Sequence, residues 1–91
     1  MAGEGATPEE LLLDAFVLPL RKPITFASIT YTELNLKEPT AQQWTCWDKL
    51  DGVEADIMAV ATIAAVPKQV VEQLGSRDLL IAARYIVRFL R

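Results

Sequence analysis

The stretch TYTELNL, residues 30–36, decides the N-terminal half of the fold. Its leucines, Leu34 and Leu36, fall on one face of an extended chain, and polar side chains fall on the other. A shorter alternation precedes it at residues 23–26, and only Ala27-Ser28 lies between the two. This spacing predicts a β-hairpin, although its turn lacks the glycine that such turns favour.

Two interpretations fit the residues before the hairpin. Residues 7–10, TPEE, have the form of a helix start, so a short helix would cover Leu11 to about Ala15. Alternatively, residues 15–18 form an edge strand that Pro19 ends. The two can follow one another. We expect residues 1–14 to be a loose tail or short helix and residues 15–91 to form a single domain.

A helix is predicted to begin at Thr40, because Gln43 stands at the capping-box position three residues later. Trp44 and Trp47 then lie on one helix face, with Leu50 one turn further on. Large rings at this spacing are typical of core anchors, so we expect both to be buried. The alternative is that they form a hot spot for a partner.

Three more helices are expected in the C-terminal half. Residues 53–66 are apolar nearly all round and predict a central, buried helix. Pro67 begins a helix that ends near Leu74, with Gly75 in a left-handed conformation. Ser76 caps the last helix. Because the strands precede the helices, the fold class is α+β: a small N-terminal antiparallel hairpin or sheet followed by three to four packed helices.

Composition excludes several classes of function. The chain has 91 residues, of which 52% are hydrophobic, so we expect either a very apolar core or a surface that meets a partner. The net charge of −3 argues against nucleic-acid binding. Since the chain has no histidine, the usual general base and zinc ligand are missing. We therefore expect no enzymatic activity, no cofactor and no metal.

Location follows from the same features. The longest apolar stretch, residues 57–66, is too short to span a membrane. The N-terminus lacks the basic region of a secretory signal. The one cysteine, Cys46, cannot form an internal disulfide, which is typical of a reducing cytoplasm.

Two groups of reactive side chains have plain structural explanations. Because the chain has no histidine to act as a base, Cys46 is interpreted as a small buried or half-buried hydrophobe. A cluster of carboxylates near a helix junction gives an incomplete calcium pattern and is interpreted as helix-terminus stabilisation. This cluster comprises Asp48, Asp51, Glu54 and Asp56.

The last helix carries three rows of side chains. The basic row comprises Arg77, Arg84, Arg88 and Arg91. The expected core row, nearly opposite, comprises Leu79, Ala83, Ile86 and Leu90. Between them runs an apolar ladder of Ile81, Tyr85 and Phe89. Either the ladder packs on the hairpin, or it grips an amphipathic helix of a partner, with arginines at the rim.

The order of short motifs along residues 17–90 resembles the tail assembly chaperones of Mu-like and P2-like contractile-tail phages and prophages. The glycine common in the hairpin turn of that family is replaced here by Ala27-Ser28, and residues 1–15 have no clear counterpart. The motifs are Lys22-Pro23-Ile24, Glu33-Leu34, Lys37-Glu38-Pro39-Thr40, Met58 to Val66, Pro67, Leu74 and Arg77-Asp78.

This resemblance implies a non-enzymatic protein that keeps the phage tape measure protein soluble and helps recruit tail tube subunits. It also implies a location in the host bacterial cytoplasm, absence from the mature virion, and in many members a longer product made by programmed frameshifting. The alternative is a structural or homo-oligomeric adaptor of the particle. The residues expected to contact a partner are Ile81, Arg84, Tyr85, Arg88, Phe89 and Trp44.

Overall fold

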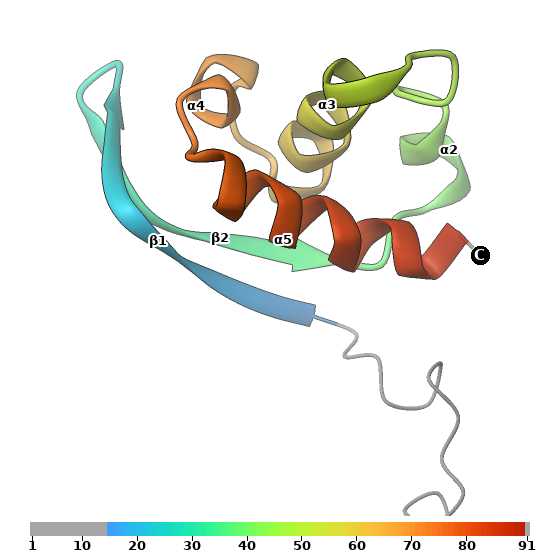
Figure 1. The fold of residues 1–91 in the computed structure, drawn as a ribbon, viewed down its shortest axis with the longest axis horizontal. Coiled ribbons are helices and arrows are strands. Elements are labelled where there is room, and N and C mark those ends of the chain that lie inside the picture. Colours follow the sequence, from blue (N-terminus) through green and yellow to red (C-terminus); the bar gives the residue numbers. More distant parts are fainter. Residues whose placement is uncertain (1–14, 91) are drawn as a thin grey trace, which may run out of the picture.

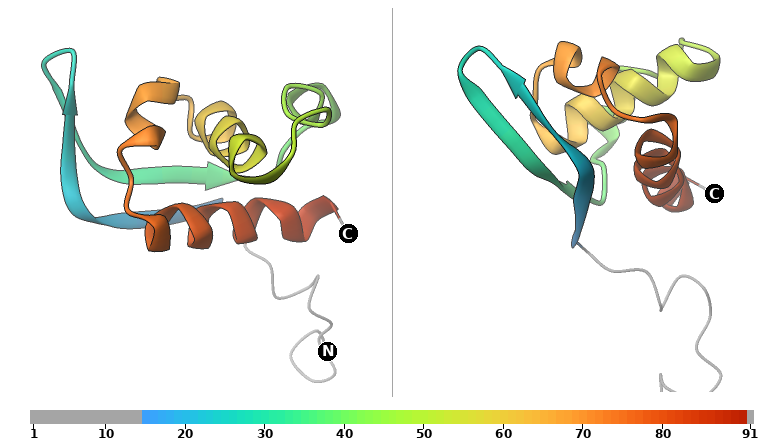
Figure 2. Two further views of the ribbon diagram at one scale, coloured as in Figure 1. Left: turned by 45° about the horizontal axis from the view of Figure 1, so that its top comes forward. Right: turned by 60° about the vertical axis from the view of Figure 1, so that its left-hand side comes forward.

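A computed structural model describes residues 15–90 of the chain, and the expectations for residues 1–14 lie outside this range. Two strands precede the helices, as the α+β assignment predicts (Figure 1). The elements are β1 (Ala15–Phe26), β2 (Ile29–Lys37), α2 (Ala41–Trp44), α3 (Gly52–Ala64), α4 (Lys68–Glu72), α5 (Ser76–Val87) and the 3-10 helix η1 (Arg88–Leu90). The helices lie on one side of the hairpin (Figure 2).

The hairpin is confirmed, and its first strand is longer than the alternation of residues 23–26 indicates. β1 begins at Ala15, so the strand interpretation of residues 15–18 is right, and Pro19 lies within the strand rather than at its end. Ala15 pairs with Lys37, and Phe26 pairs with Ile29 across the turn. The turn therefore has two residues, Ala27 and Ser28, and both adopt positive φ angles of 53° and 67°. Such angles match the twist of the flanking strands and are usually supplied by glycine or asparagine.

A bulge divides the hairpin into two halves. The pairing passes from Pro19 with Glu33 to Ile24 with Tyr31, so four residues of β1 lie opposite Thr32 alone. Extra residues on one strand bend it and increase its twist. The hairpin accordingly bends at this point, and its tip half turns toward α4 (Figure 1).

The inner face of the hairpin forms one wall of the core. Leu18 of β1 is paired with Leu34 of β2, and both are buried together with Leu36. The helices contribute Val60 and Ile63 from α3 and further buried residues from α4 and α5. The leucine face read from the sequence is therefore the core face.

The helix predicted from Thr40 to Leu50 is much shorter than expected. The capping box is present, since the Gln43 amide donates to Thr40 Oγ1 at 3.1 Å and the Thr40 amide donates to Gln43 Oε1 at 2.9 Å. The α-helix nevertheless ends at Trp44, and tight turns follow in which Trp47 N–H donates to the Trp44 carbonyl at 3.1 Å.

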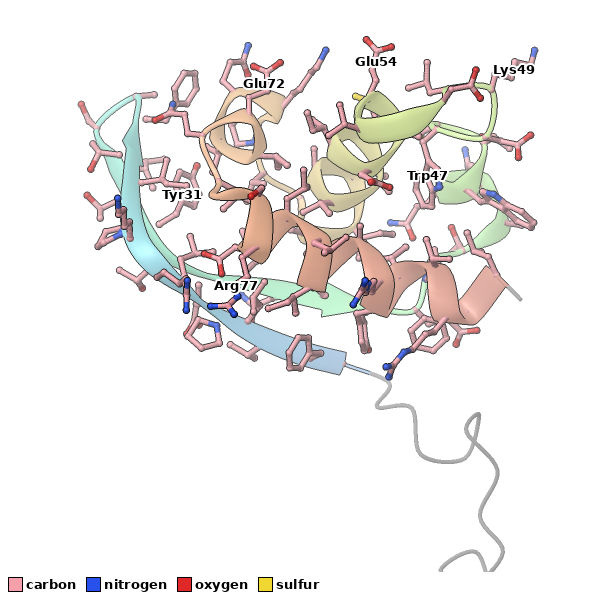
Figure 3. All side chains as sticks on the ribbon, viewed as in Figure 1. Tyr31, Trp47, Lys49, Glu54, Glu72 and Arg77 are labelled. Atoms are coloured by element: carbon pink, nitrogen blue, oxygen red, sulfur yellow. The ribbon has the colours of Figure 1, made fainter. Side chains whose placement is uncertain are left out.

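The two tryptophans consequently separate. Trp47 is buried in the core and lies between α2 and α3 (Figure 3), whereas the side chain of Trp44 is 40% exposed. The expectation that both rings are buried is right for Trp47 and wrong for Trp44. Trp44 is exposed because α2 ends early, so the helical spacing that would place the two rings on one face is lost.

The helix junctions also differ in part from expectation. The central helix, α3, ends at Ala64, and the next residue, Ala65, caps it in a left-handed conformation with a φ of 57°. Gly75 has a φ of −61° and stands at the N-cap of α5, so it is not the left-handed residue that the sequence suggested. Ser76 is the first residue of α5 and makes no side-chain cap. The chain therefore passes from α4 to α5 without a left-handed residue between them.

Candidate partner-binding surface

The orientation of α5 about its own axis decides which of its side chains a partner can reach. Its buried residues are Asp78, Ala82, Ala83, Tyr85 and Ile86. This row is turned by about 60° from the expected core row. Leu79 and Leu90 of the expected row are only partly buried.

Packing between aromatic rings explains this rotation of α5 about its axis. The ring of Tyr85 lies against the ring of Phe16 in β1, with centroids 5.2 Å apart, and it is only 8% exposed. Phe89 meets Tyr85 edge-on, also at 5.2 Å. Edge-to-face and tilted pairs at this separation are favourable. The hairpin therefore holds the Tyr85 side of α5 inward.

The predicted ladder is divided by this packing. Tyr85 belongs to the core, Phe89 is half-buried beside it, and Ile81 is 41% exposed. The aromatic end of the ladder packs on the hairpin, as the first interpretation expects. The Ile81 end is exposed, and its contact with a partner helix stays a prediction. Arg84 and Arg88 are exposed, as expected.

A groove between α3 and α5 was not anticipated from the sequence. One depression of about 370 Å³ is lined by Asp56, Leu80, Ala83, Arg84, Val87 and Arg88. An adjoining depression of about 480 Å³ is lined by Val53, Asp56, Ser76, Arg77, Leu79 and Leu80. Because Asp56 and Leu80 line both, we describe them together as the α3–α5 groove.

Leu80 is the residue that sequence reasoning missed. Its side chain is 47% exposed, and Val53 on the α3 side of the groove is also largely exposed. The sequence feature that could have predicted the exposure of Leu80 is the pair of adjacent small residues Ala82 and Ala83. Small side chains at neighbouring positions allow close approach of a helix, so a core row through Ala82 places Leu80 nearly opposite.

Charge along the groove is mostly positive. Arg77, Arg84 and Arg88 line it, and Asp56 is the one acidic residue among the lining residues of the two depressions. Glu54 and Glu72 project on the opposite side of the helical layer, away from α5 (Figure 3). The described part of the chain therefore presents an apolar strip bordered by guanidinium groups, which suits an apolar and acidic partner.

Trp44 lies outside this groove. It belongs to α2, which packs against α3, and it is not among the residues that line either depression. Its exposed ring is a separate apolar feature of the surface. The structure brings Arg84 and Arg88 together with Leu80, and it leaves Trp44 apart.

The acidic residues and the cysteine of the described range bear on the expectations from the sequence. The acidic residues near the start of α3 do not gather into a group that could hold a metal ion within residues 15–90. Cys46 is exposed rather than half-buried. Every buried side-chain nitrogen and oxygen in the same range has a hydrogen-bond partner. None of the described helices is long and apolar enough to cross a bilayer.

Buried Asp78 joins α5 to the bulge of the hairpin. Its Oδ2 accepts a hydrogen bond from the backbone N–H of Arg21 at 3.1 Å. Arg21 is one of the residues of β1 that have no partner in β2. This contact fixes the N-terminal end of α5, and with it the groove, relative to the hairpin.

Comparison with known proteins identifies the family. The sequence profile of one family, described as phage tail assembly chaperone proteins, E, or 41 or 14, matches residues 17–91. Searches of curated proteins and of solved structures gave no significant match. The match spans most of the chain and includes every described helix and the hairpin from residue 17 onward. The chain therefore belongs to this family of phage tail assembly chaperones.

Proposed function

We propose that this chaperone binds the tape measure protein of its phage, keeps it soluble in the host cytoplasm and helps recruit tail tube subunits. It acts without catalysis and is absent from the mature virion. The observation that carries the proposal is the exposed face of α5, where Leu80 and Ile81 stand beside Arg84 and Arg88. Membership of the family supports protein partners in tail assembly.

The chemistry of this face fits an amphipathic helix. Such a helix offers apolar side chains at positions i, i+3, i+4 and i+7, which can cover Leu80, Ile81 and the rest of the apolar strip. Acidic side chains flanking its apolar stripe can pair with Arg84 and Arg88 at the rim. Phe89 is half-buried at the end of the strip, and Tyr85 supports the surface from the core. Trp44 provides a second apolar contact for a longer partner.

Binding of this kind to the tape measure protein is reversible. A single small surface of mixed character gives modest affinity. Many copies cover a long helical partner when the concentration of the chaperone exceeds the dissociation constant of the single contact. Each copy can still leave as tube subunits replace it, because the dissociation rate is set by the individual contact.

Co-expression tests the proposal. The tape measure protein of the same phage is produced with and without this chain, and its soluble fraction and co-purification are measured. We expect the tape measure protein to become soluble and to co-purify. A tape measure protein that stays insoluble with this chain, and also with any longer frameshifted product of the same gene, would contradict the proposal.

The alternative is a homo-oligomeric adaptor that remains in the particle. In this alternative, the exposed apolar strip of α5 packs against a second copy of the chain. Light scattering separates the two, since an adaptor forms a larger species as concentration rises. A monomer over the full range, with the tape measure protein still bound, supports the chaperone function.

A further inference from the structure

Asp56 interrupts an otherwise apolar row of α3. The buried residues of this helix are Ala59, Val60, Ala61 and Ile63. Residues three and four positions apart lie on one helix face, so Asp56 continues the row of Ala59 and Val60 by one turn toward the N-terminus. Its side chain is half-buried and lines both depressions of the α3–α5 groove. A charged side chain therefore stands where the core row would place an apolar one.

The carboxylate of Asp56 makes no hydrogen bond or ion pair within the described part of the chain. Arg77, Arg84 and Arg88 line the same groove, yet none of them pairs with it in the structure. The helix dipole does not account for the charge either, because it acts within the first turn and Asp56 is the fifth residue of α3. The acidic residue of the first turn is Glu54, whose side chain projects away from α5 (Figure 3). The described contacts of the fold thus give no reason for a carboxylate at position 56.

A partner that enters the groove removes water from this carboxylate. Leu80 and Val53 line the depressions beside it, so its surroundings become apolar once a partner covers them. A buried carboxylate without a partner costs free energy, whereas a basic side chain placed beside it recovers much of that cost. A wholly apolar stripe on the partner is therefore disfavoured opposite Asp56. Single polar groups within apolar interfaces fix the register of helices in this way.

We propose that Asp56 sets the register of the bound helix, which carries one basic side chain within its apolar stripe, opposite Asp56, and acidic side chains opposite the groove arginines. The inference rests on the proposed function and specifies the chemistry of the helix that the groove accepts. Arg77 lines one depression, Arg84 and Arg88 line the other, and Asp56 lines both. The complementary charges of the partner therefore run acidic, basic, acidic along the groove. A helix displaced along the groove brings like charges together and is rejected.

Two synthetic peptides of identical composition test this selection. Both are amphipathic helices with a leucine stripe flanked by glutamates, and a lactam bridge on the solvent face keeps both helical. The stripe-lysine peptide has a lysine at the centre of the stripe and a leucine on the solvent face, and the face-lysine peptide has these two residues exchanged. Because their net charges are equal, general electrostatic attraction does not distinguish them.

Fluorescence anisotropy measures the affinity of the full chain for each peptide at low salt. The wild type is expected to bind the stripe-lysine peptide about tenfold more tightly than the face-lysine peptide, because only the former supplies a partner for Asp56. A tenfold difference corresponds to about 1.4 kcal/mol, which is within the cost of leaving one buried polar group without a partner.

Three variants of the full chain decide whether Asp56 makes the selection. Asp56→Leu should reverse the preference, since the stripe lysine then lies against an apolar groove. Asp56→Asn is nearly isosteric and uncharged; it should abolish most of the preference, and it preserves the test if Asp56→Leu does not fold. Glu54→Leu removes the same charge from an exposed position on the same helix and should keep the wild-type preference. Circular dichroism and urea denaturation establish that each variant is folded.

Reversal in Asp56→Leu, together with the wild-type preference in Glu54→Leu, supports the proposal. Equal affinity of the wild type for the two peptides, or an unchanged preference in Asp56→Leu and Asp56→Asn, would overturn it. Either of these results leaves the proposed function standing, because the chain still binds an amphipathic helix. Binding of neither peptide also overturns the inference, and the co-expression test then decides independently whether the chain keeps the tape measure protein soluble.

Discussion

At the hairpin turn, Ala27 and Ser28 adopt a conformation that their side chains disfavour. A left-handed backbone costs an L-residue about 1–2 kcal/mol, and glycine escapes this cost. We expect Ser28→Gly to raise the free energy of unfolding by about 1 kcal/mol, measured by urea denaturation. Ser28→Val should lower it, because a β-branched side chain fits this region poorly. A Ser28→Gly protein that is less stable than the wild type would contradict the turn geometry.

The two tryptophans offer a second test at the residue scale. Trp47→Ala removes a buried ring and should destabilise the fold by about 3–5 kcal/mol. Trp44→Ala should cost about 1 kcal/mol or less, because the ring is half in solvent. Single-tryptophan proteins made with Trp44→Phe or Trp47→Phe provide the check by acrylamide quenching. The Trp44 emission should be quenched readily and the Trp47 emission weakly; equal quenching would contradict the placement.

Among the elements, the contact between α5 and the bulge of β1 depends on Asp78. Asp78→Ala leaves the Arg21 amide without its acceptor and should cost about 1–3 kcal/mol. Hydrogen exchange at the Arg21 amide reports this directly, and its protection should fall in the variant. Exposed Asp48 gives the control, since Asp48→Ala should leave that protection unchanged. Unaltered protection in Asp78→Ala would show that the contact does not anchor α5.

The elements also show which features of the fold a sequence can reveal. Alternation with period two predicted the leucine face of β2, because burial on one side of a strand selects every second residue. It could not predict the bulge, which depends on where α5 and α4 meet the hairpin. The capping box at Thr40 was visible, whereas the end of α2 at Trp44 was not, because burial of Trp47 is a tertiary effect.

The candidate site was predictable only in outline for the same reason. The last helix was recognised as the element with surplus apolar and basic side chains. Its rotation depended on Phe16 packing against Tyr85, a contact between residues far apart in the sequence. That rotation buries Tyr85 and exposes Leu80, which is why the sequence named the right helix and an incomplete set of its residues.

For the whole molecule, the groove arginines predict a salt-dependent affinity for the partner. Interactions between exposed charges weaken as ionic strength rises, since the Debye length falls from about 10 Å at 0.1 M to about 3 Å at 1 M. We expect Arg84→Glu with Arg88→Glu to weaken tape measure binding and reduce its salt dependence, as measured by titration at several salt concentrations. Lys49→Glu, on the far side from α5, is the matched control (Figure 3). An unchanged salt dependence in the double variant would exclude the arginines from the interface.

The central claim is that the exposed face of α5 binds the tape measure protein. Its most direct test is co-purification of the tape measure protein with Leu80→Asp, Ile81→Asp double-variant chain. Ile29→Asp, the control, places one aspartate at the hairpin tip on a residue that is 54% exposed, compared with 47% for Leu80 and 41% for Ile81. The double variant should keep the far-ultraviolet circular dichroism of the wild type and lose the tape measure protein, while Ile29→Asp retains it. A folded double variant that still co-purifies with the tape measure protein would contradict the claim.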